Sequence, residues 1–181
     1  MQMEEAIKSF SKQLAYEPEV KNIEKLPKYK SYIVSGMGGS HLAADLLRIL
    51  KPELQLYIHR NYGLPKLPKK VLEKSLIIAS SYSGNTEEAL STYKEAKENN
   101  LSLVVVSTGG KLLEQAKQDG TPYIQLPDMG IQPRSALGLS IVATFALIRD
   151  KKLLKEAKKL SKKFKPEDIE EEGKVISKNI F

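Results

Sequence analysis

Short apolar runs alternate with stretches of helical periodicity over the first 150 residues of the chain. The runs are rich in valine, isoleucine and leucine and contain no charged residue, which is typical of parallel strands buried on both faces. They predict five strands, at residues 32–34, 54–58, 75–80, 101–107 and 123–126.

Apolar residues spaced three and four positions apart predict helices before the first strand and after most of the others. The first helix is expected over residues 3–15, where Ala6, Phe10 and Leu14 share one face. Repeated strand–helix units indicate an α/β fold, a doubly wound (flavodoxin-like) parallel sheet of about five strands flanked by helices. The remaining helices are expected at 40–50, 86–99, 111–119 and 136–149.

The pattern changes after Asp150, where lysines become frequent. Residues 151–165 predict an amphipathic helix with a solvated basic face, and a helix that binds a lipid surface or an acidic partner is the alternative. Pro166 ends this helix, and a further short helical stretch follows. We therefore expect one domain over residues 1–150 and a basic C-terminal helical extension over residues 151–181. The apolar face of the amphipathic helix holds Leu153, Leu154, Ala157, Leu160 and Phe164.

The formal net charge of +7 is unevenly distributed along the 181 residues. The C-terminal extension holds ten lysines and six acidic residues, which gives +4 of this total. The chain has no tryptophan and 7% aromatic residues, so few side chains could stack on bases. We expect no nucleic-acid partner, because surplus lysine also suits an anionic small molecule or keeps a chain soluble.

Composition narrows the class of protein further. With 41% hydrophobic and 28% charged residues, the chain can bury a core of ordinary globular character. No apolar run approaches the roughly 18 residues of a membrane span, and the N-terminus lacks the apolar stretch of a secretory signal. The absence of cysteine excludes disulfides, thiolate metal sites and a cysteine nucleophile. We expect a cytoplasmic protein with no membrane partner.

A glycine-rich loop, Gly36-Met37-Gly38-Gly39-Ser40, follows the first predicted strand and precedes a helix. Glycines allow the backbone to approach a ligand closely, and the first N–H groups of a helix can bind an anion. The spacing is not G-x-G-x-x-G and no acidic residue follows the next strand, so NAD is not expected. A structural turn explains one glycine but less readily three, so this loop is predicted to contact a ligand.

Three hydroxyls, those of Ser81, Ser83 and Thr86, gather after the third predicted strand. Hydroxyls together with helix-terminal amides bind phosphate without an arginine clamp, and Gly84 lets the chain fold around a ligand. The lysine of a Walker loop is absent, so hydrolysis of nucleoside triphosphates is not implied. A threonine N-cap with a glutamate capping box would need only one hydroxyl. We therefore predict a phosphate-binding cup.

Further candidates follow other strands. Arg134 comes after a proline at the start of the last helix of the domain, where it could meet an oxygen-rich substrate or simply lie on the surface. The glycine loop at 107–110 is a weaker candidate for a ligand-binding loop. His41 and His59 could transfer protons because histidine titrates near neutral pH, although a histidine at a helix start is often structural.

The segments GMGGS, SYSGNTEE, STGGKL and QPRSALG, in this order on an α/β chain, resemble the sugar isomerase (SIS) domain superfamily. From the first helix to about Arg149 the chain is similar to the N-terminal half of the bifunctional phosphoglucose/phosphomannose isomerases. The resemblance implies a single SIS domain, a phosphorylated hexose as ligand, and no metal or nucleotide cofactor. The family usually dimerises, so we expect a homodimer or higher oligomer.

The resemblance also implies roles for individual residues. Arg134 would hold the substrate or the enediolate intermediate. The hydroxyls that it implies around the phosphate are those of Ser81, Ser83 and Thr86. The residues that it implies along the sugar are Gly38, Gly39 and Ser40.

Aldose–ketose isomerisation moves a proton between C1 and C2 through an enediol, which requires a base and a stabiliser for the developing oxyanion. In the family, the base is a glutamate of a second SIS domain, and the partner subunit contributes a histidine. We expect both groups to lie outside this chain. Glu170, Glu171 and Glu172 could reach a neighbouring site, but a solvated helix start is the simpler interpretation.

Three functions remain open from the sequence. The first is a sugar-phosphate isomerase domain that interconverts glucose 6-phosphate or mannose 6-phosphate with fructose 6-phosphate, incomplete without a second SIS domain. The second is a non-catalytic phosphosugar-binding or sensing module. The third is an interaction protein that uses its basic helix.

Overall fold

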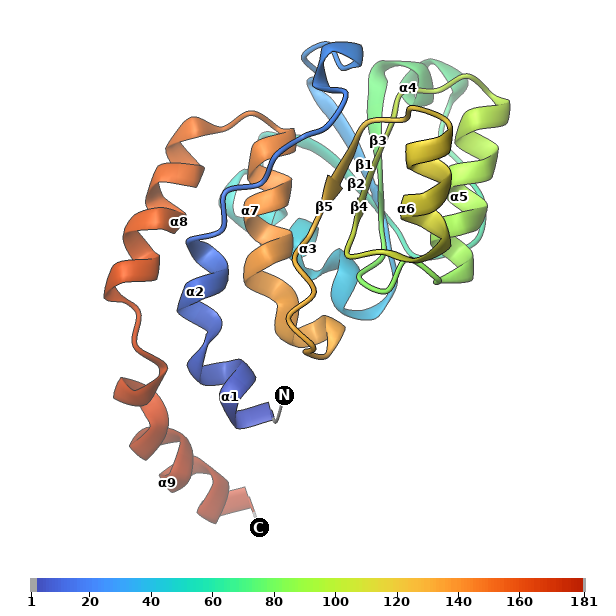
Figure 1. The fold of residues 1–181 in the computed structure, drawn as a ribbon. Coiled ribbons are helices and arrows are strands. Elements are labelled where there is room, and N and C mark those ends of the chain that lie inside the picture. Colours follow the sequence, from blue (N-terminus) through green and yellow to red (C-terminus); the bar gives the residue numbers. More distant parts are fainter. Residues whose placement is uncertain (1–2, 181) are drawn as a thin grey trace.

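The computed structural model describes residues 3–180, with side chains described up to residue 178. Five strands form one parallel sheet in the order β2-β1-β3-β4-β5 (Figure 1). The predicted doubly wound, flavodoxin-like α/β class is therefore confirmed. The strands are β1 (Ser31–Ser35), β2 (Gln55–His59), β3 (Ser75–Ser80), β4 (Leu103–Ser107) and β5 (Tyr123–Gln125).

The strand order creates a switch point between β1 and β3. The chain passes from β1 outward to β2, and then returns across β1 to continue the sheet on its other side. Crossovers on the two sides of this point cover opposite faces, so the loops leaving β1 and β3 separate and leave a crevice at their carboxyl ends. The glycine-rich loop follows β1, and the hydroxyl-rich segment follows β3.

Helices cover both faces of the sheet (Figure 1). On one face lie α3 (Leu42–Leu50) and α7 (Leu137–Leu147). On the other lie α4 (Lys69–Lys74), α5 (Glu87–Glu98) and α6 (Gly110–Gln118). The short helix α4 was not predicted, because six residues give too little periodicity to recognise.

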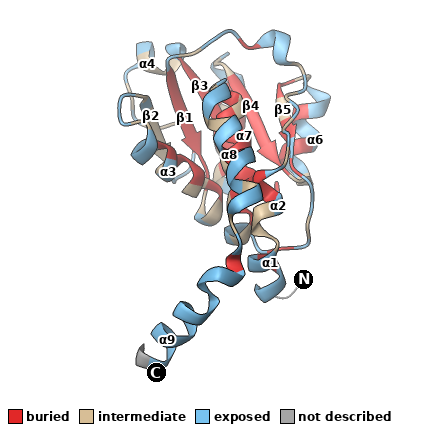
Figure 2. Cartoon of the chain, turned by 90° about the vertical axis from the view of Figure 1, so that its left-hand side faces the viewer, coloured by how far each residue is buried: buried red, intermediate tan, exposed pale blue. Residues whose placement is uncertain are grey.

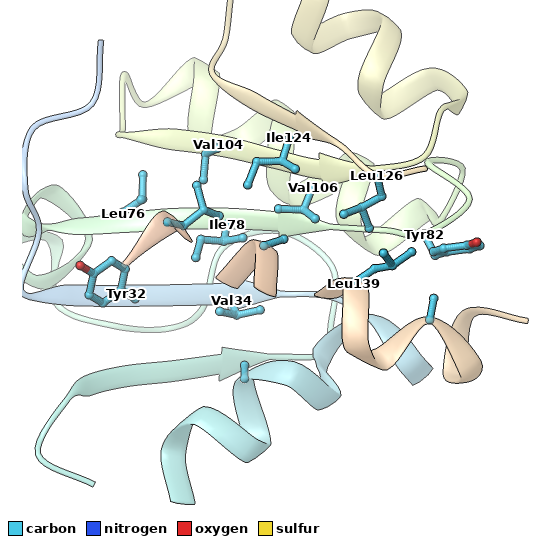
Figure 3. Packing of buried hydrophobic residues seen from close by; sticks show 14 of the residues in the cluster. Tyr32, Val34, Leu76, Ile78, Tyr82, Val104, Val106, Ile124, Leu126 and Leu139 are labelled. Atoms are coloured by element: carbon cyan, nitrogen blue, oxygen red, sulfur yellow. The ribbon is translucent and has the colours of Figure 1, made fainter. Parts of the chain in front are cut away.

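Side chains that alternate along the strands fill the two cores. On the α7 side, Val34, Ile78 and Val104 pack with Leu139 of α7 (Figure 3). On the α5 side, the fully buried Ile77 packs with helix residues of α5 and α6. Each fully buried aliphatic side chain contributes roughly 1.5–3 kcal/mol, so burial on both faces holds the strands in register.

A further helical layer covers α7. It consists of α1 (Met3–Lys8), α2 (Phe10–Leu14) and α8 (Lys151–Lys163). The single helix predicted over 3–15 is interrupted at Ser9, whose hydroxyl donates to the Ala6 carbonyl at 3.2 Å. A serine hydroxyl that bonds to nearby backbone competes with the helical ladder, which accounts for the break.

The C-terminal extension contains two different helices. Leu153, Leu154 and Ala157 of α8 pack toward α7, as the amphipathic interpretation predicts, whereas Leu160 of the same predicted face is exposed. Beyond the turn η4 (Pro166–Ile169), α9 (Glu170–Ile180) projects from the body and is exposed along its described side chains (Figure 2). The division of the chain at residue 150 stays a prediction. None of the helices within residues 3–180 combines the length and apolar character needed to cross a bilayer.

Candidate functional site

A cleft of about 500 Å³ opens at the carboxyl ends of β1 and β3, where the switch point predicts a ligand site. Its volume lies in the range that accommodates small molecules. Three segments form its walls: the loop after β1, the loop after β3 and the turn η3 (Pro133–Ala136) before α7. The lining residues are Met37, Gly38, Gly39, Ser40, Leu42, Tyr82, Ser83, Thr86, Gln132, Pro133 and Arg134.

The glycine loop packs directly against the arginine turn. A Cβ on Gly39 would lie 2.6 Å from the Arg134 backbone nitrogen, so only a glycine lets these two walls meet. Gly38 has φ +53° and faces open space, so glycine is favoured there by its backbone conformation. The tight-turn requirement and the predicted ligand contact therefore coexist in this loop.

Ser40 and Tyr82 join two walls of the cleft. The Ser40 hydroxyl is buried and accepts a hydrogen bond from the Tyr82 backbone N–H at 3.2 Å. Burial raises the pKa of the Tyr82 hydroxyl above its usual value. That hydroxyl accepts a hydrogen bond from the Met129 backbone N–H at 3.5 Å, which ties the loop after β3 to the loop after β5.

The three hydroxyls of the predicted phosphate cup occupy two layers. Ser83 and Thr86 line the cleft, whereas Ser81 is fully buried behind them. The Ser81 and Thr86 hydroxyls lie 2.8 Å apart, and the Ser81 oxygen also accepts from the Gly84 backbone N–H at 3.1 Å. Ser81 therefore positions Thr86, and its predicted direct contact with phosphate stays a prediction.

Thr86 is the N-cap residue of α5, but its side chain makes no capping hydrogen bond. The capping box considered from the sequence is thus not formed, and the hydroxyl bonds to Ser81 instead. The first backbone N–H groups of an α-helix have no partner within the helix and favour negative charge. Thr86 consequently places a hydroxyl beside the start of a twelve-residue helix.

The glycine loop at 107–110 supports the hydroxyl loop from behind and is not among the lining residues. The Thr108 hydroxyl donates to the Tyr82 carbonyl at 2.6 Å. Gly84 has φ +72°, and a Cβ there would lie 1.8 Å from the Gly109 carbonyl oxygen. The loop at 107–110 is therefore a structural support, or buttress, for the loop after β3. Its glycines are nevertheless also typical of a ligand-binding loop.

Arg134 is the only charged residue among those that line the cleft. Its side chain is exposed and forms no hydrogen bond or ion pair with another residue of the described chain. An unpaired guanidinium in a cleft that two hydroxyls also line favours an anionic, oxygen-rich ligand. The lining set contains no aspartate, glutamate or histidine.

Known proteins share both sequence and fold with this chain. No family model matches the sequence. The chain is 39% identical over 148 residues to a bifunctional phosphoglucose/phosphomannose isomerase of Caldicellulosiruptor bescii, which covers 80% of this chain and 40% of the relative. It is 32% identical over 180 residues to the protein of the same name from Aquifex aeolicus, which covers 97% of this chain and 54% of the relative.

Among solved structures, tagatose-6-phosphate ketose/aldose isomerase from Escherichia coli superimposes with a TM-score of 0.62. The alignment covers 88% of this chain and 50% of that chain at 16% identity, so it supports the shared fold alone. The chain is homologous to these isomerases over most of its length and has the sugar isomerase (SIS) fold. It spans about half the length of the curated relatives it matches.

The two histidines of this SIS domain lie outside the residues that line the cleft. His41 Nδ1 is 2.6 Å from Asp45 Oδ2, and Arg60 donates to the same carboxylate at 2.9 Å. His59 Nε2 lies 3.3 Å from the Tyr62 carbonyl oxygen. These partners give both histidines structural roles, and a role in proton transfer stays a prediction.

Sequence analysis missed several lining residues of the SIS domain. Tyr82 and Gln132 lie inside the recognised segments, but nothing in their spacing distinguishes a lining side chain from a neighbour that faces the core. Within the described residues, no group of three or more acidic or histidine side chains is arranged to hold a metal ion.

Proposed function

We propose that this SIS domain binds a phosphorylated hexose in the cleft between β1 and β3. The observation that carries the proposal is the unpaired Arg134 on the same cleft as the Ser83 and Thr86 hydroxyls. The hydroxyls and the start of α5 would hold the phosphate, which suits a helix N-terminus. Gly38, Gly39 and Ser40, in the loop after β1, would line the sugar.

The reaction proposed is aldose–ketose isomerisation of glucose 6-phosphate or mannose 6-phosphate with fructose 6-phosphate. The names of the sequence relatives support this reaction, and the cleft supports the binding part of it. The enediolate carries negative charge on the oxygens at C1 and C2. Arg134 would stabilise that charge, and a donor aimed at a developing oxyanion typically contributes about 10²–10³-fold in kcat.

The base that moves the proton is the part that the described cleft does not provide. No carboxylate or histidine lines it, and Glu170 and Glu171 of α9 are exposed and paired with Lys174. We therefore propose that a glutamate on a second SIS domain completes the site. The same observation favours the second candidate, a phosphosugar-binding module without catalysis.

Two finer expectations accompany the proposal. A homodimer or higher oligomer fits a site that needs a group from another domain, and the exposed apolar side chains Ile49 and Leu50 of α3 are available for such contact. A cytoplasmic location fits a phosphorylated sugar as ligand. Both expectations stay predictions, as does the absence of a nucleic-acid or membrane partner.

A coupled assay on the 181-residue chain with fructose 6-phosphate tests the proposal, with glucose 6-phosphate and mannose 6-phosphate measured separately. Calorimetric titration with fructose 6-phosphate measures binding independently of turnover. Turnover supports the isomerase with a base inside the chain, and binding without turnover supports a half site. Absence of both contradicts the proposal.

Arg134→Ala and Arg48→Ala form a matched pair for the same titration. Both substitutions remove an exposed arginine, but Arg48 lies on α3 and pairs with Asp45 at 3.4 Å outside the cleft. We expect the Arg134 variant alone to lose affinity, by about 1.5–3 kcal/mol for a hydrogen bond to a charged group. Equal loss in both variants would indicate a general effect of positive charge.

A further inference from the structure

Gln13 is a buried polar residue that the proposed function does not use. It lies on α2, far from the cleft in sequence, and its side chain is completely inaccessible to solvent. Burying an amide is unfavourable unless its hydrogen bonds are satisfied, so a fully buried glutamine marks a position where specific bonds are made.

The Gln13 amide bonds to the segment that follows Arg134. Its nitrogen Nε2 donates to the Ser135 carbonyl at 2.7 Å. Its oxygen Oε1 accepts from the backbone N–H groups of Gly138 at 3.0 Å and Leu139 at 3.4 Å. These N–H groups belong to the first turn of α7, where no partner exists within the helix. Gln13 therefore caps α7 from a different helix.

The local sequence around α7 makes this outside cap necessary. The N-cap residue of α7 is Ala136, whose side chain cannot accept a hydrogen bond. Gly138 provides the space, since a Cβ there would lie 2.7 Å from the Gln13 Cβ. The turn that carries Arg134 is thus held by Gly39 on its cleft side and by Gln13 behind it.

We infer that Gln13 is a positioning residue for Arg134, so that helix α2 sets the geometry of the phosphosugar cleft. The Arg134 guanidinium has no partner of its own, which leaves the backbone of residues 133–136 to determine where it points. Removing the Gln13 amide would free the Ser135 carbonyl and two N–H groups of α7 together. The inference rests on the proposed function for its consequence, but its structural part is independent of it.

Gln13→Met tests the inference because methionine keeps the length of the side chain and makes none of the three bonds. Tyr93→Phe is the matched control: it removes a hydroxyl that bonds to Asp119 at 2.7 Å and Thr121 at 3.0 Å on the opposite face of the sheet. Fructose 6-phosphate affinity is measured by calorimetry at a temperature where both variants are folded. We expect Gln13→Met to weaken binding about 10-fold or more, and Tyr93→Phe to leave it within about 2-fold.

A double-mutant cycle separates positioning from general destabilisation. In an Arg134→Ala background, Gln13→Met should change affinity by less than about 2-fold, because its effect acts through Arg134. Additive losses, or equal affinity of Gln13→Met and the wild-type chain, would overturn the inference. If Gln13→Met fails to fold, Gln13→Glu, which retains the acceptor for Gly138 and Leu139, replaces it with a smaller expected loss.

Amide hydrogen exchange gives a readout that does not need the ligand. Gln13→Met should lose protection at Gly138 and Leu139, while the first turn of α5 is unchanged. If the wild-type chain does not bind fructose 6-phosphate, the proposed function fails, and exchange still decides whether Gln13 holds this turn. Unchanged protection at both amides contradicts the inference whatever the ligand.

Discussion

Two of the segments that line the cleft, the loop after β3 and the turn with Arg134, are stabilised in different ways. The loop after β3 is bonded internally through Ser81 and Thr86, and it also packs against Gly109 of the loop after β4. The turn with Arg134 has one local backbone bond, from the Ser135 N–H to the Gln132 carbonyl at 2.8 Å, and is otherwise held by Gly39 and Gln13, which come from distant parts of the chain. The hydroxyls on the proposed phosphate side are thus held by bonds within their own loop, whereas the arginine side depends more on residues from distant parts of the chain.

The two sides of the cleft suit different parts of the proposed ligand. Phosphate is the same in every sugar phosphate, and the proposed cup, whose Ser81 and Thr86 hydroxyls bond within one loop, suits such a constant group. The enediolate exists only during the reaction, and its position depends on the sugar. A turn held by separate helices can be adjusted to that position without any change to the phosphate cup. The following substitutions test each side of the comparison.

Gly84→Ala should have the largest effect, because it disrupts the loop after β3 where that loop packs most closely against Gly109. A Cβ at Gly84 would lie 1.8 Å from the Gly109 carbonyl oxygen at φ +72°. We expect a loss of about 2–5 kcal/mol in the free energy of unfolding, from overpacking and left-handed strain together. Urea denaturation measures it. Gly130→Ala, at φ +62° with open space around it, is the control and should show the strain alone.

Ser83→Ala combined with Thr86→Ala should weaken fructose 6-phosphate binding by about 2–4 kcal/mol, because two hydrogen bonds to a charged group are lost. Isothermal titration measures the change, and the free energy of unfolding should move far less. Ser177→Ala removes an exposed hydroxyl on α9, bonded only to the Lys174 carbonyl at 2.9 Å, and should leave affinity unchanged. Unaltered affinity in the double variant would remove these hydroxyls from the phosphate site.

Ser40→Ala should have an intermediate effect on stability. It leaves the buried Tyr82 N–H without its acceptor, which costs about 1–3 kcal/mol. Because this bond joins the glycine loop to the hydroxyl loop, phosphosugar affinity should fall as well. Ser40→Thr keeps an acceptor oxygen and should recover part of both losses. Equal urea midpoints for Ser40→Ala and the wild-type chain would show that the bond contributes nothing.

Asp150→Ala should have the smallest effect, because Asp150 caps α8, a helix that supports the turn with Arg134 only through its contacts with α2 and α7. Asp150 caps α8 by accepting from the Lys152 and Leu153 N–H groups at 3.0 Å each. Loss of such a cap costs about 1 kcal/mol. Thermal unfolding at pH 7 measures it, and Ser161→Ala on the same helix is the control.

The cap also has a pH dependence with a defined sign. The Leu153 N–H bond, followed by the pairing with Lys51 at 3.0 Å, holds the pKa of Asp150 below its ordinary value. A carboxyl with a lowered pKa in the folded state stabilises fully above its unfolded pKa of about 4. This contribution disappears as the pH falls through the folded pKa. The difference between wild type and Asp150→Ala should therefore shrink below pH 4, and a constant difference would contradict this role.

Much of the fold was predictable because its signals are local. Uninterrupted runs such as Ile77-Ile78 and Val104-Val105-Val106 can be satisfied only by strands buried on both faces, and the structure places them there. The carboxyl ends of parallel strands meet at one edge, so the order of motifs along the chain already indicated one site. Ser83, Thr86, Gly39 and Arg134 lie together for this reason.

The sequence by itself therefore determined the class of fold, the segments of the site and the residue types available for an anionic ligand, since each depends on periodicity or on neighbours within a few residues. Only the tertiary structure decided that Ser81 lies behind the cup, that the loop at Gly109 is a buttress, and that Gln13 caps α7. These assignments depend on packing between residues up to 126 positions apart. A hydroxyl or an amide has the same local signature whether it faces a ligand or a neighbouring helix, and burial alone distinguishes the two.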